Sequence, residues 1–349
     1  MKILLDAMGG DLGCEPVVLG AVEAKKTVNA EFILVGDERA LDAVFEKHHL
    51  AKDSFTILHA PETVTMEDDP TRVVREKKQS SMVVGLTALK NGEGDVLLSS
   101  GNTGALLTGA TVLVGRVRGV RRATLGVKFP TKKGGSVVIV DTGANAECTP
   151  EYLEQFALLG SAYAETCGGV NEARIGLLSN GTEEHKGNTL VKQTHVLLKT
   201  LGEKGLIRFA GNVEAREVFS GDVDVIVCDG FTGNVLLKTV EGTASFLMSL
   251  IKNMFLSSFA TKLAALLVKP KLGGLKSMLD YRSVGATPIL GIAKPVFKAH
   301  GASDQAAWAS AIRSAQQYLD CGTDKRIGEL MQKFREIEKD GTGNPAGAE

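Results

Sequence analysis

The ten residues Val225-Ile-Val-Cys-Asp-Gly-Phe-Thr-Gly-Asn234 decide the fold that this chain can adopt. A short apolar run, Val225–Val227, leads directly into a turn of glycine and small polar residues. The same order recurs at three earlier places, where the turns are Asp6-Ala-Met-Gly-Gly-Asp11, Ser100-Gly-Asn-Thr-Gly104 and Asp141-Thr-Gly-Ala-Asn145. Three of the four turns are followed by a segment with a helical pattern. Strand, tight turn and helix in this order predict a parallel α/β sheet.

Other apolar runs of strand length are separated mostly by segments of helix length. They lie at Phe32–Val35, Phe55–Leu58, Ile175–Leu178 and Ile207–Phe209. Thr149 and Pro150 predict the start of one helix, and Ser303 predicts the start of another. No linker-like stretch divides the chain. The sequence therefore predicts a single doubly wound α/β domain with a mostly parallel sheet over residues 1–340, followed by a disordered tail at 341–349.

The composition argues against several classes of function. With 349 residues, of which 44% are hydrophobic, the chain can bury a large core. Its net charge of −1 provides no general attraction for nucleic acid. The five cysteines are scattered without a Cys-x-x-Cys pair, which argues against a zinc site or a disulfide framework and fits a reducing cytosol. There is no signal-like segment and no run of about 18 apolar residues, so we expect a cytoplasmic protein, with no cofactor and no metal site.

A segment at 242–285 is predicted to protrude from this domain as a basic amphipathic insertion. From Gly242 to Leu279 it contains no Asp or Glu, but it holds five lysines among many large apolar residues. Phe255 lies on the apolar face of one predicted helix, and Leu263 and Leu267 lie on the apolar stripe of a second. Such helices bind membrane surfaces, and the missing acids favour that role. The alternative is a helical pair packed on a second subunit or on the core, because any surface helix has an apolar stripe.

A second run of unbalanced charge lies between Gly115 and Val140, where no acid occurs. Its basic residues are Arg116, Arg118, Arg121, Arg122, Lys128, Lys132 and Lys133. The simpler interpretation is a solvated surface loop. The more specific interpretation is a docking surface for an acidic partner, which charge complementarity would steer to these residues.

The four turns carry groups that bind anions. Backbone N–H groups at helix starts, with the amides of Asn102, Asn145 and Asn234, stabilise negative charge. A further segment, 180–188, adds Lys186 near a helix start. Because ligands collect at the carboxyl ends of parallel strands, we expect all four turns at one sheet edge, in one site. The simpler explanation for each Asn or Asp alone is a turn or helix-cap residue.

Several common catalytic motifs are absent. The chain lacks the Gly-x-Gly-x-x-Gly of dinucleotide-binding folds, the phosphate-loop motif and the Gly-x-Ser-x-Gly of serine hydrolases. No cysteine or histidine pattern indicates a nucleophile or a zinc protease. A site with oxyanion donors and a lysine, but no nucleophile, suits a substrate that brings its own reactivity. Phosphate is such a substrate, because it needs orientation more than activation.

Six motifs resemble those of the bacterial phosphate acyltransferase family and occur in family order from Ile3 to about Leu319. They are Asp6-Ala-Met-Gly-Gly-Asp11, Ser100-Gly-Asn-Thr-Gly-Ala105, His185-Lys-Gly-Asn188, Gly211-Asn-Val-Glu214, Asp229-Gly-Phe-Thr-Gly-Asn234 and Lys298-Ala-His-Gly-Ala-Ser-Asp304. The resemblance implies a three-layer α/β/α fold like that of phosphotransacetylases and isocitrate-dehydrogenase-like proteins. One segment departs from the family pattern: a glycine-rich stretch ending Ala-Pro-Leu-Leu-Gly is replaced by Ser283-Val-Gly-Ala-Thr-Pro-Ile-Leu-Gly291.

The resemblance also implies an activity and partners. It implies transfer of a fatty acyl group from acyl carrier protein to inorganic phosphate. The acyl phosphate product then serves a membrane-bound glycerol-3-phosphate acyltransferase in phospholipid synthesis. A homodimer that works in the cytoplasm and associates peripherally with the membrane is implied as well. The strongly acidic carrier protein would suit the arginines of the basic run.

We expect phosphate to attack the thioester carbonyl directly, without a covalent acyl-enzyme. Lys186 would hold the phosphate, and Asn234, Asn102 or both would donate to the thioester oxygen. The other candidates for phosphate binding are Gly101, Thr103, Gly104, Asn145, Asn188, Thr232 and Gly233, and the expected loop braces are Asp6, Asp11 and Asp229. The alternatives are a coenzyme A-dependent phosphotransacylase, a decarboxylating dehydrogenase with the same sheet, and a non-catalytic scaffold that docks acyl carrier protein at the membrane.

Overall fold

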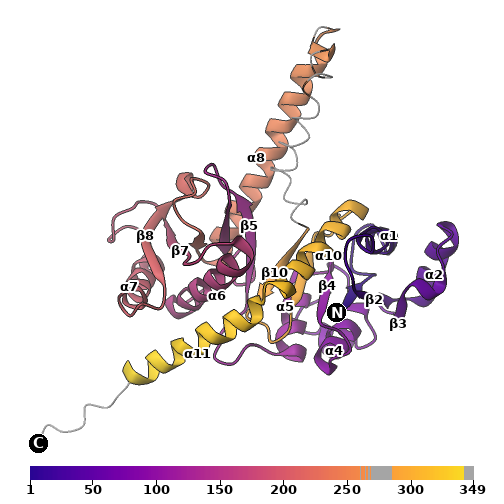
Figure 1. Ribbon diagram of the computed structural model, residues 1–349, viewed down its shortest axis with the longest axis horizontal. Helices are drawn as coiled ribbons and strands as arrows, with labels where there is room; N and C mark the ends of the chain where they lie inside the picture. The colour runs from indigo at the N-terminus through magenta and orange to yellow at the C-terminus, as the bar shows by residue number, and fades with distance from the viewer. Residues whose placement is uncertain (260, 264, 266–267, 269–284, 342–349) are drawn as a thin grey trace, which may run out of the picture.

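Eleven strands form one sheet in the computed structural model, with helices on both of its faces (Figure 1). The structure describes all residues except 260, 264, 266–267, 269–284 and 342–349. The strands are β1 (Lys2–Asp6), β2 (Glu31–Gly36), β3 (Thr56–His59), β4 (Val96–Ser99), β5 (Thr124–Pro130), β6 (Ser136–Val140), β7 (Arg174–Ser179), β8 (Arg208–Glu214), β9 (Val225–Val227), β10 (Ala286–Leu290) and β11 (Val296–Ala299). The helices are α1 (Glu15–Ala24), α2 (Glu38–Lys47), α3 (Val73–Glu76), α4 (Ser81–Asn91), α5 (Thr103–Gly109), α6 (Pro150–Gly168), α7 (Thr189–Glu203), α8 (Gly230–Leu256), α10 (Gln305–Asp320) and α11 (Thr323–Gly341), with short turns η1 (Lys52–Ser54), η2 (Ala110–Val114) and η3 (Ala215–Glu217).

The sheet is mostly parallel, as the sequence predicts, but it consists of two blocks that run in opposite directions. The strand order is β3-β2-β1-β4-β11-β10-β5-β6-β9-β7-β8. The first block extends from β3 to β11, and the second from β6 to β8. Between them, β11–β10, β10–β5 and β5–β6 all pair antiparallel. The expectation that all four turns lie at one sheet edge is therefore wrong, because three reversals separate the turns after β1 and β4 from those after β6 and β9.

The strands that cause this reversal, β5, β10 and β11, are missing from the sequence-based prediction. β5 lies inside the basic run between Gly115 and Val140, so that run is not one surface loop. Its apolar residues are interrupted by Gly126 and Lys128, and β10 contains Pro288. In β11, Lys298 interrupts the apolar residues. None of the three therefore forms the continuous apolar run that identifies a buried strand.

The two faces of the sheet are packed differently. On one face, α1, α2, α6, α7, α10 and α11 cover a continuous core that spans both blocks and includes Trp308 and Phe156. On the other face the core is divided into two clusters, one under α4 and α5 and one at the base of α8. Side chains alternate along a strand, and on this second face Leu125 of β5 joins the first cluster while Val127 joins the second. The division of the core leaves space between the two blocks.

Most helix ends follow local sequence signals. α6 begins at Pro150 with Thr149 at its N-cap position, as predicted. α10 begins slightly later than predicted, because its N-cap is Asp304, whose carboxylate accepts a hydrogen bond from the Ala307 N–H at 2.9 Å. α11 ends at Gly341, so the first residue of the predicted tail is helical, and the rest of that tail lies outside the described residues.

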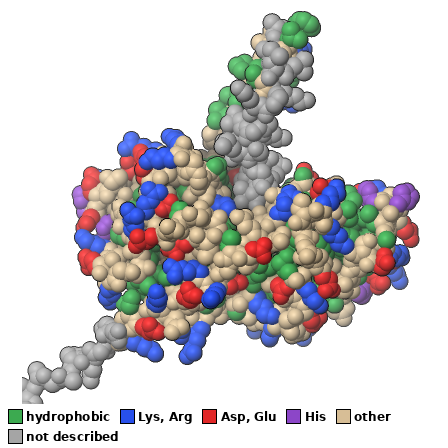
Figure 2. Space-filling model, in the orientation of Figure 1, with side chains coloured by type: hydrophobic (Ala, Val, Ile, Leu, Met, Phe, Trp, Pro, Cys, Tyr) green, Lys and Arg blue, Asp and Glu red, His purple; other side chains and the backbone are tan. Residues whose placement is uncertain are grey.

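α8 leaves the fourth turn and extends away from the sheet (Figure 1). The predicted insertion at 242–285 therefore begins in the middle of a 27-residue helix. Phe246, Leu250 and Met254 are exposed on α8, and Leu263 is exposed beyond it. Figure 2 shows hydrophobic side chains along this protruding segment. Within the described part of the chain, no helix has the length and apolar character needed to cross a bilayer.

Candidate functional site

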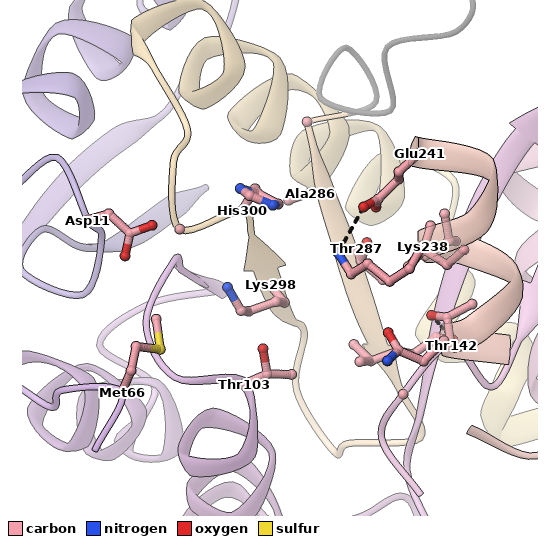
Figure 3. A pocket seen from close by; sticks show the side chains of 17 residues that line it. Asp11, Met66, Thr103, Thr142, Lys238, Glu241, Ala286, Thr287, Lys298 and His300 are labelled. Carbon is pink, nitrogen blue, oxygen red and sulfur yellow. Dashed lines mark hydrogen bonds and ion pairs between the residues drawn. The ribbon is translucent and has the colours of Figure 1, made fainter. Parts of the chain in front are cut away.

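A cavity of about 520 Å³ lies between the two blocks of the sheet (Figure 3). Each of the four turns contributes to its wall, through Asp11, Thr103, Thr142 with Gly143, and Asn234. The central strands and α8 supply most of the remaining lining, including Leu125, Val127, Thr287, Lys298, Lys238 and Glu241. Sheet twist accumulates by roughly 20–25° per strand pairing, so four pairings rotate β6 strongly relative to β4. The turns therefore meet at one cavity although they leave the sheet in opposite directions.

Asp141 organises the turn after β6. Its buried carboxylate accepts hydrogen bonds from the backbone N–H groups of Leu125, Gly143 and Ala144 through Oδ1. Oδ2 accepts from the backbone N–H and the side-chain amide of Asn145, at 2.7 and 2.9 Å. The same amide donates to the Ala123 carbonyl at 2.8 Å. Asn145 is thus engaged in holding the turn against β5.

The first turn of α8 packs directly on the Asp141 turn. A Cβ atom on Gly233 would lie 1.8 Å from the backbone carbonyl oxygen of Asp141. A Cβ on Gly230 would lie 2.5 Å from the backbone oxygen of Asn145. Only glycine permits an approach of two backbones this close. The two glycines therefore fix where α8 begins.

This fit places Asn234 on the cavity wall. Asp229 caps α8 by accepting hydrogen bonds from the N–H of Thr232 at 2.8 Å and from its hydroxyl at 2.7 Å. Asn234, two residues further on, lies next to Gly143, where a Cβ would be 3.5 Å from the Asn234 side chain. The Asn234 side chain has no hydrogen-bond partner among the described residues. Its amide is therefore available to a molecule in the cavity.

In the first block, the turns after β1 and β4 pack on each other. Asp6 is fully buried and accepts a hydrogen bond from the Ser99 hydroxyl at 2.6 Å. Burial raises the pKa of the Asp6 carboxyl, and hydrogen bonds from the Ser99 hydroxyl and the Met8 N–H partly oppose that rise. A Cβ on Gly9 would lie 2.8 Å from the backbone nitrogen of Gly101, so the two turns are in close contact. Asp6 thus occupies a bracing position, whereas Asp11 lines the cavity.

Lys298 of β11 lies in the cavity, although it is absent from the sequence-based set of site residues. It shares a face of β11 with Val296, which belongs to the divided side of the core. Its Nζ donates to the backbone carbonyls of Ser100, at 3.0 Å, and Ala299. Burial lowers the pKa of Lys298 to about 8, and the carboxylates of Asp11 and Asp6 oppose that shift. The motif Lys298-Ala-His-Gly-Ala-Ser-Asp304, which begins with this lysine, is the sequence signal that could have identified it.

The opposite wall carries a second cation that is already paired. Lys238 of α8 forms an ion pair with Glu241 at 2.8 Å (Figure 3). Lys298 forms no ion pair with any carboxylate in the part of the chain that the structure describes. No group of three or more His, Cys, Asp or Glu side chains there is arranged to hold a metal ion.

Several predicted site residues lie elsewhere. Asn102 is the N-cap of α5, where its side-chain oxygen accepts a hydrogen bond from the Ala105 N–H at 3.1 Å. Its amide nitrogen lies 3.4 Å from the carbonyls of Thr65 and Met66. Gly101 and Gly104 are packed tightly, with Cβ positions 2.7 Å from Met82 and 2.9 Å from Pro70. These residues shape the cavity wall more than they face the cavity.

A second cavity, of about 400 Å³, lies where β7 and β9 end. Asn188, Asp229 and Thr232 line it, and Asn188 is the N-cap of α7. Lys186 lies in the loop before α7, half-buried, with its stem against Gly181. It is not among the residues that line either cavity. The sequence-based mechanism places Lys186 and Asn234 together, but only Asn234 lines the cavity between the two blocks.

The cysteines near the Asp141 turn are poor nucleophiles. Burial raises the pKa of Cys148 to about 12 and raises the pKa of Cys228 well above its ordinary value. The thiolate is the reactive form of cysteine, so neither residue supplies it at neutral pH.

The four arginines Arg116, Arg118, Arg121 and Arg122 are exposed, but three of them have local partners. Arg121 pairs with Glu338 of α11 at 3.0 Å, and Arg116 donates to the Arg121 carbonyl. Arg122 lies over the Tyr152 ring, 5.5 Å from its centroid. Lys132 and Lys133 follow β5, so the strand separates them from the arginines. The basic run is therefore two surfaces and not one.

Comparison with known proteins gives a consistent result. The family model described as "Fatty acid synthesis protein" matches residues 1–326. A phosphate acyltransferase of Exiguobacterium sibiricum is 45% identical over 97% of this chain and 100% of its own length. One of Clostridioides difficile is 41% identical over 97% of this chain and 98% of its own length.

Solved structures agree on the fold. A phosphotransacetylase from Streptococcus pyogenes matches with a TM-score of 0.60 and 18% identity, over 92% of this chain and 94% of that one. The EutD phosphotransacetylase from Staphylococcus aureus matches with a TM-score of 0.58 and 18% identity, over 91% and 94%. The predicted phosphotransacetylase-like α/β fold is thereby confirmed.

Proposed function

This chain belongs to the phosphate acyltransferase family, and we propose that it transfers a fatty acyl group from the thioester of acyl carrier protein to inorganic phosphate. Acyl transfer to phosphate in lipid synthesis is the activity that the family relationship supports. The carrier-protein donor and the acyl phosphate product are the finer parts of this proposal. The acyl phosphate would pass to a membrane-bound glycerol-3-phosphate acyltransferase for phospholipid synthesis.

One structural observation supports this proposal above the others. The cavity between the two blocks combines a half-buried cation, Lys298, with an amide on the facing wall, Asn234, and with hydroxyls such as that of Thr103. A cation holds an anionic nucleophile, and an amide N–H stabilises an oxyanion. The nearby cysteines are protonated at neutral pH, so they do not compete as nucleophiles.

The proposed reaction is a direct displacement. A phosphate oxygen forms a bond with the thioester carbonyl carbon, and the carbon–sulfur bond breaks. The carrier leaves as a thiolate and takes up the proton that the attacking hydrogen phosphate releases. Negative charge develops on the carbonyl oxygen in the transition state, so a preorganised donor at that point lowers the barrier most.

Asn234 is the oxyanion donor in this scheme. Its side chain lines the cavity without a partner among the residues described, and glycine contacts beneath α8 fix its position. Asn102 supports the site as the cap of α5. Lys186, in the loop before α7, is the alternative cation for phosphate, and Lys186→Met tests it beside Lys298→Met.

The donor is tested by comparing two thioesters of the same acyl chain. We expect the carrier-protein thioester to be used with a higher kcat/KM than the coenzyme A thioester. The reverse order would favour a coenzyme A-dependent phosphotransacylase. Binding of a nicotinamide cofactor would instead favour the dehydrogenase alternative, and no thiol release from either donor would favour the scaffold.

The surface around Arg118 is the proposed docking site for the acidic carrier protein. Arg118 is exposed, and among the four arginines it is the one to which the described residues offer neither a hydrogen bond, an ion pair nor a ring contact. Arg118→Glu should raise KM for the carrier thioester and leave KM for the coenzyme A thioester unchanged. Equal effects on both donors would contradict docking at this surface.

The protruding segment is the proposed site of peripheral membrane association, within a cytoplasmic homodimer. Leu263 is exposed beyond α8, and Phe255 is half-buried near the end of that helix, while Leu267 lies outside the described residues. Replacing Phe255, Leu263 and Leu267 with serine should abolish binding to anionic lipid vesicles without changing the sedimentation coefficient. If the protein instead becomes monomeric, the apolar stripe serves subunit packing.

A further inference from the structure

We propose that Lys298 is the cation that binds the attacking phosphate in the cavity between the two blocks, an inference that rests on the proposed acyl transfer to phosphate. The position of Lys298 follows from the alternation of side chains along β11. Val296 and Lys298 face the divided side of the core, whereas Phe297 and Ala299 face the continuous side. Figure 3 shows the Lys298 amine inside the cavity, between Asp11 and Thr103.

The hydrogen bonds of Lys298 leave room for a ligand. An ammonium group has three N–H donors. Two of them go to the backbone carbonyls of Ser100 and Ala299, which hold the side chain in place. The third has no acceptor among the residues that the structure describes. A phosphate oxygen at this point would complete the set with a charge-assisted hydrogen bond.

The charge of Lys298 is incompletely balanced by the protein. The titratable groups that line the cavity around it are Asp11, His300, and the paired Lys238 and Glu241 of α8. The buried Asp6 does not line the cavity, but its carboxylate acts on Lys298 electrostatically. None of the described carboxylates pairs with Lys298. A cation removed from water without a partner is costly, and the lowered pKa of Lys298 reflects that cost. A bound anion would offset it.

Asp11 gives the site a preference among anions. Its carboxylate lies on the cavity wall near Lys298 and interacts with it electrostatically. An anion that is fully deprotonated would be repelled by Asp11. Hydrogen phosphate carries one hydroxyl, which can donate a hydrogen bond to Asp11 while other oxygens accept from Lys298. Lys298 and Asp11 together therefore suit hydrogen phosphate better than sulfate.

The test measures phosphate in two ways. Inorganic phosphate binding is followed by calorimetry, and KM for phosphate is measured with an acyl-carrier thioester. Lys298→Met should raise both the dissociation constant and the KM for phosphate by roughly 10- to 100-fold, because a hydrogen bond from a charged group contributes about 1.5–3 kcal/mol. Lys298→Arg should recover most of the loss. Lys294→Met is the matched control, because Lys294 precedes β11 and donates to the Leu89 carbonyl, away from the cavity.

The outcomes separate this inference from the proposed function. Unchanged phosphate binding in Lys298→Met would overturn the inference, and so would a loss confined to Lys186→Met. If the wild-type protein binds phosphate through Lys298 yet transfers no acyl group, the anion site stands and the proposed function fails.

If Lys298→Met does not fold, the wild-type protein provides the test. Sulfate, whose charge is constant, should bind more weakly as the pH rises through about 8, because Lys298 loses its charge there. Constant sulfate affinity across that range would overturn the assignment.

Discussion

Gly233→Ala should displace the Asn234 amide, the proposed oxyanion donor, without changing its chemistry. The added Cβ would lie 1.8 Å from the backbone carbonyl oxygen of Asp141, and contacts of Cβ atoms under 3.0 Å essentially do not occur. The first turn of α8 must therefore move by roughly 1.2 Å from the turn after β6. Overpacking of this kind costs about 1–3 kcal/mol. Asn234 is the next residue, so it moves with the helix.

The expected effect on activity is larger than the effect on stability. A displacement of about 1 Å in a positioning group can reduce a rate by roughly 10²-fold. We therefore expect Gly233→Ala to lower kcat for acyl phosphate formation by about that factor, together with a lower thermal unfolding temperature. Both are measured on the purified variant, with circular dichroism for unfolding and hydroxylamine trapping for the acyl phosphate.

Gly242→Ala is the matched control in the same helix. No atom lies within 4 Å of the Cβ position at Gly242. Alanine is favoured over glycine in a helix by about 1 kcal/mol, so this variant should be slightly more stable and fully active. A Gly233→Ala variant with wild-type unfolding temperature and wild-type kcat would refute the packing that places Asn234.

Two further predictions concern side chains. Asn234→Ala should lower turnover by about 10²–10³-fold, as expected for loss of an oxyanion donor. Asn102→Ala should mainly lower the free energy of unfolding by about 1 kcal/mol, because it removes a helix cap. The acyl phosphate assay distinguishes the two variants, and equal losses of turnover would contradict these roles. Burial, reinforced by the charge of Glu338, raises the pKa of Glu154 to about 7. A carboxyl whose pKa is raised by folding favours the folded state at low pH, and that advantage is lost as the pH rises from about 4.5 to about 7. In denaturant titrations, the free energy of unfolding of Glu154→Gln should exceed that of the wild type by about 1–3 kcal/mol at pH ~8 and by little at pH ~4.5. An equal gain in stability at both pH values would indicate a packing effect instead.

The sequence predicts the turns of the site better than the path of the sheet. Each of the four turns contributes to one cavity, because glycine and small polar residues after an apolar run are a local signal. The directions of the strands depend on β5, β10 and β11, whose apolar residues are interrupted by Gly126, Lys128, Pro288 and Lys298. Strand direction is a long-range property, and it reverses through the three antiparallel pairings β11–β10, β10–β5 and β5–β6.

The same limit applies to the individual residues of the site. Asn102, Asn188 and Asp229 have the cap geometry that is the simpler explanation for such residues. Asn145 is engaged by Asp141 and Ala123. A lysine within an apolar run does not indicate by itself which face of the sheet it lies on, so the position of Lys298 in the cavity depends on the strand register. The pairing of Lys298 with Ser99 across β11 and β4 fixes that register.

The central claim is that phosphate itself accepts the acyl group. The most direct measurement is the release of thiol from a long-chain acyl-carrier thioester, with and without inorganic phosphate, while acyl phosphate is trapped and counted. We predict that thiol is released only when phosphate is present, with one acyl phosphate formed for each thiol. Thiol release without phosphate, or an acyl group bound covalently to the protein, would contradict direct attack by phosphate in this cavity.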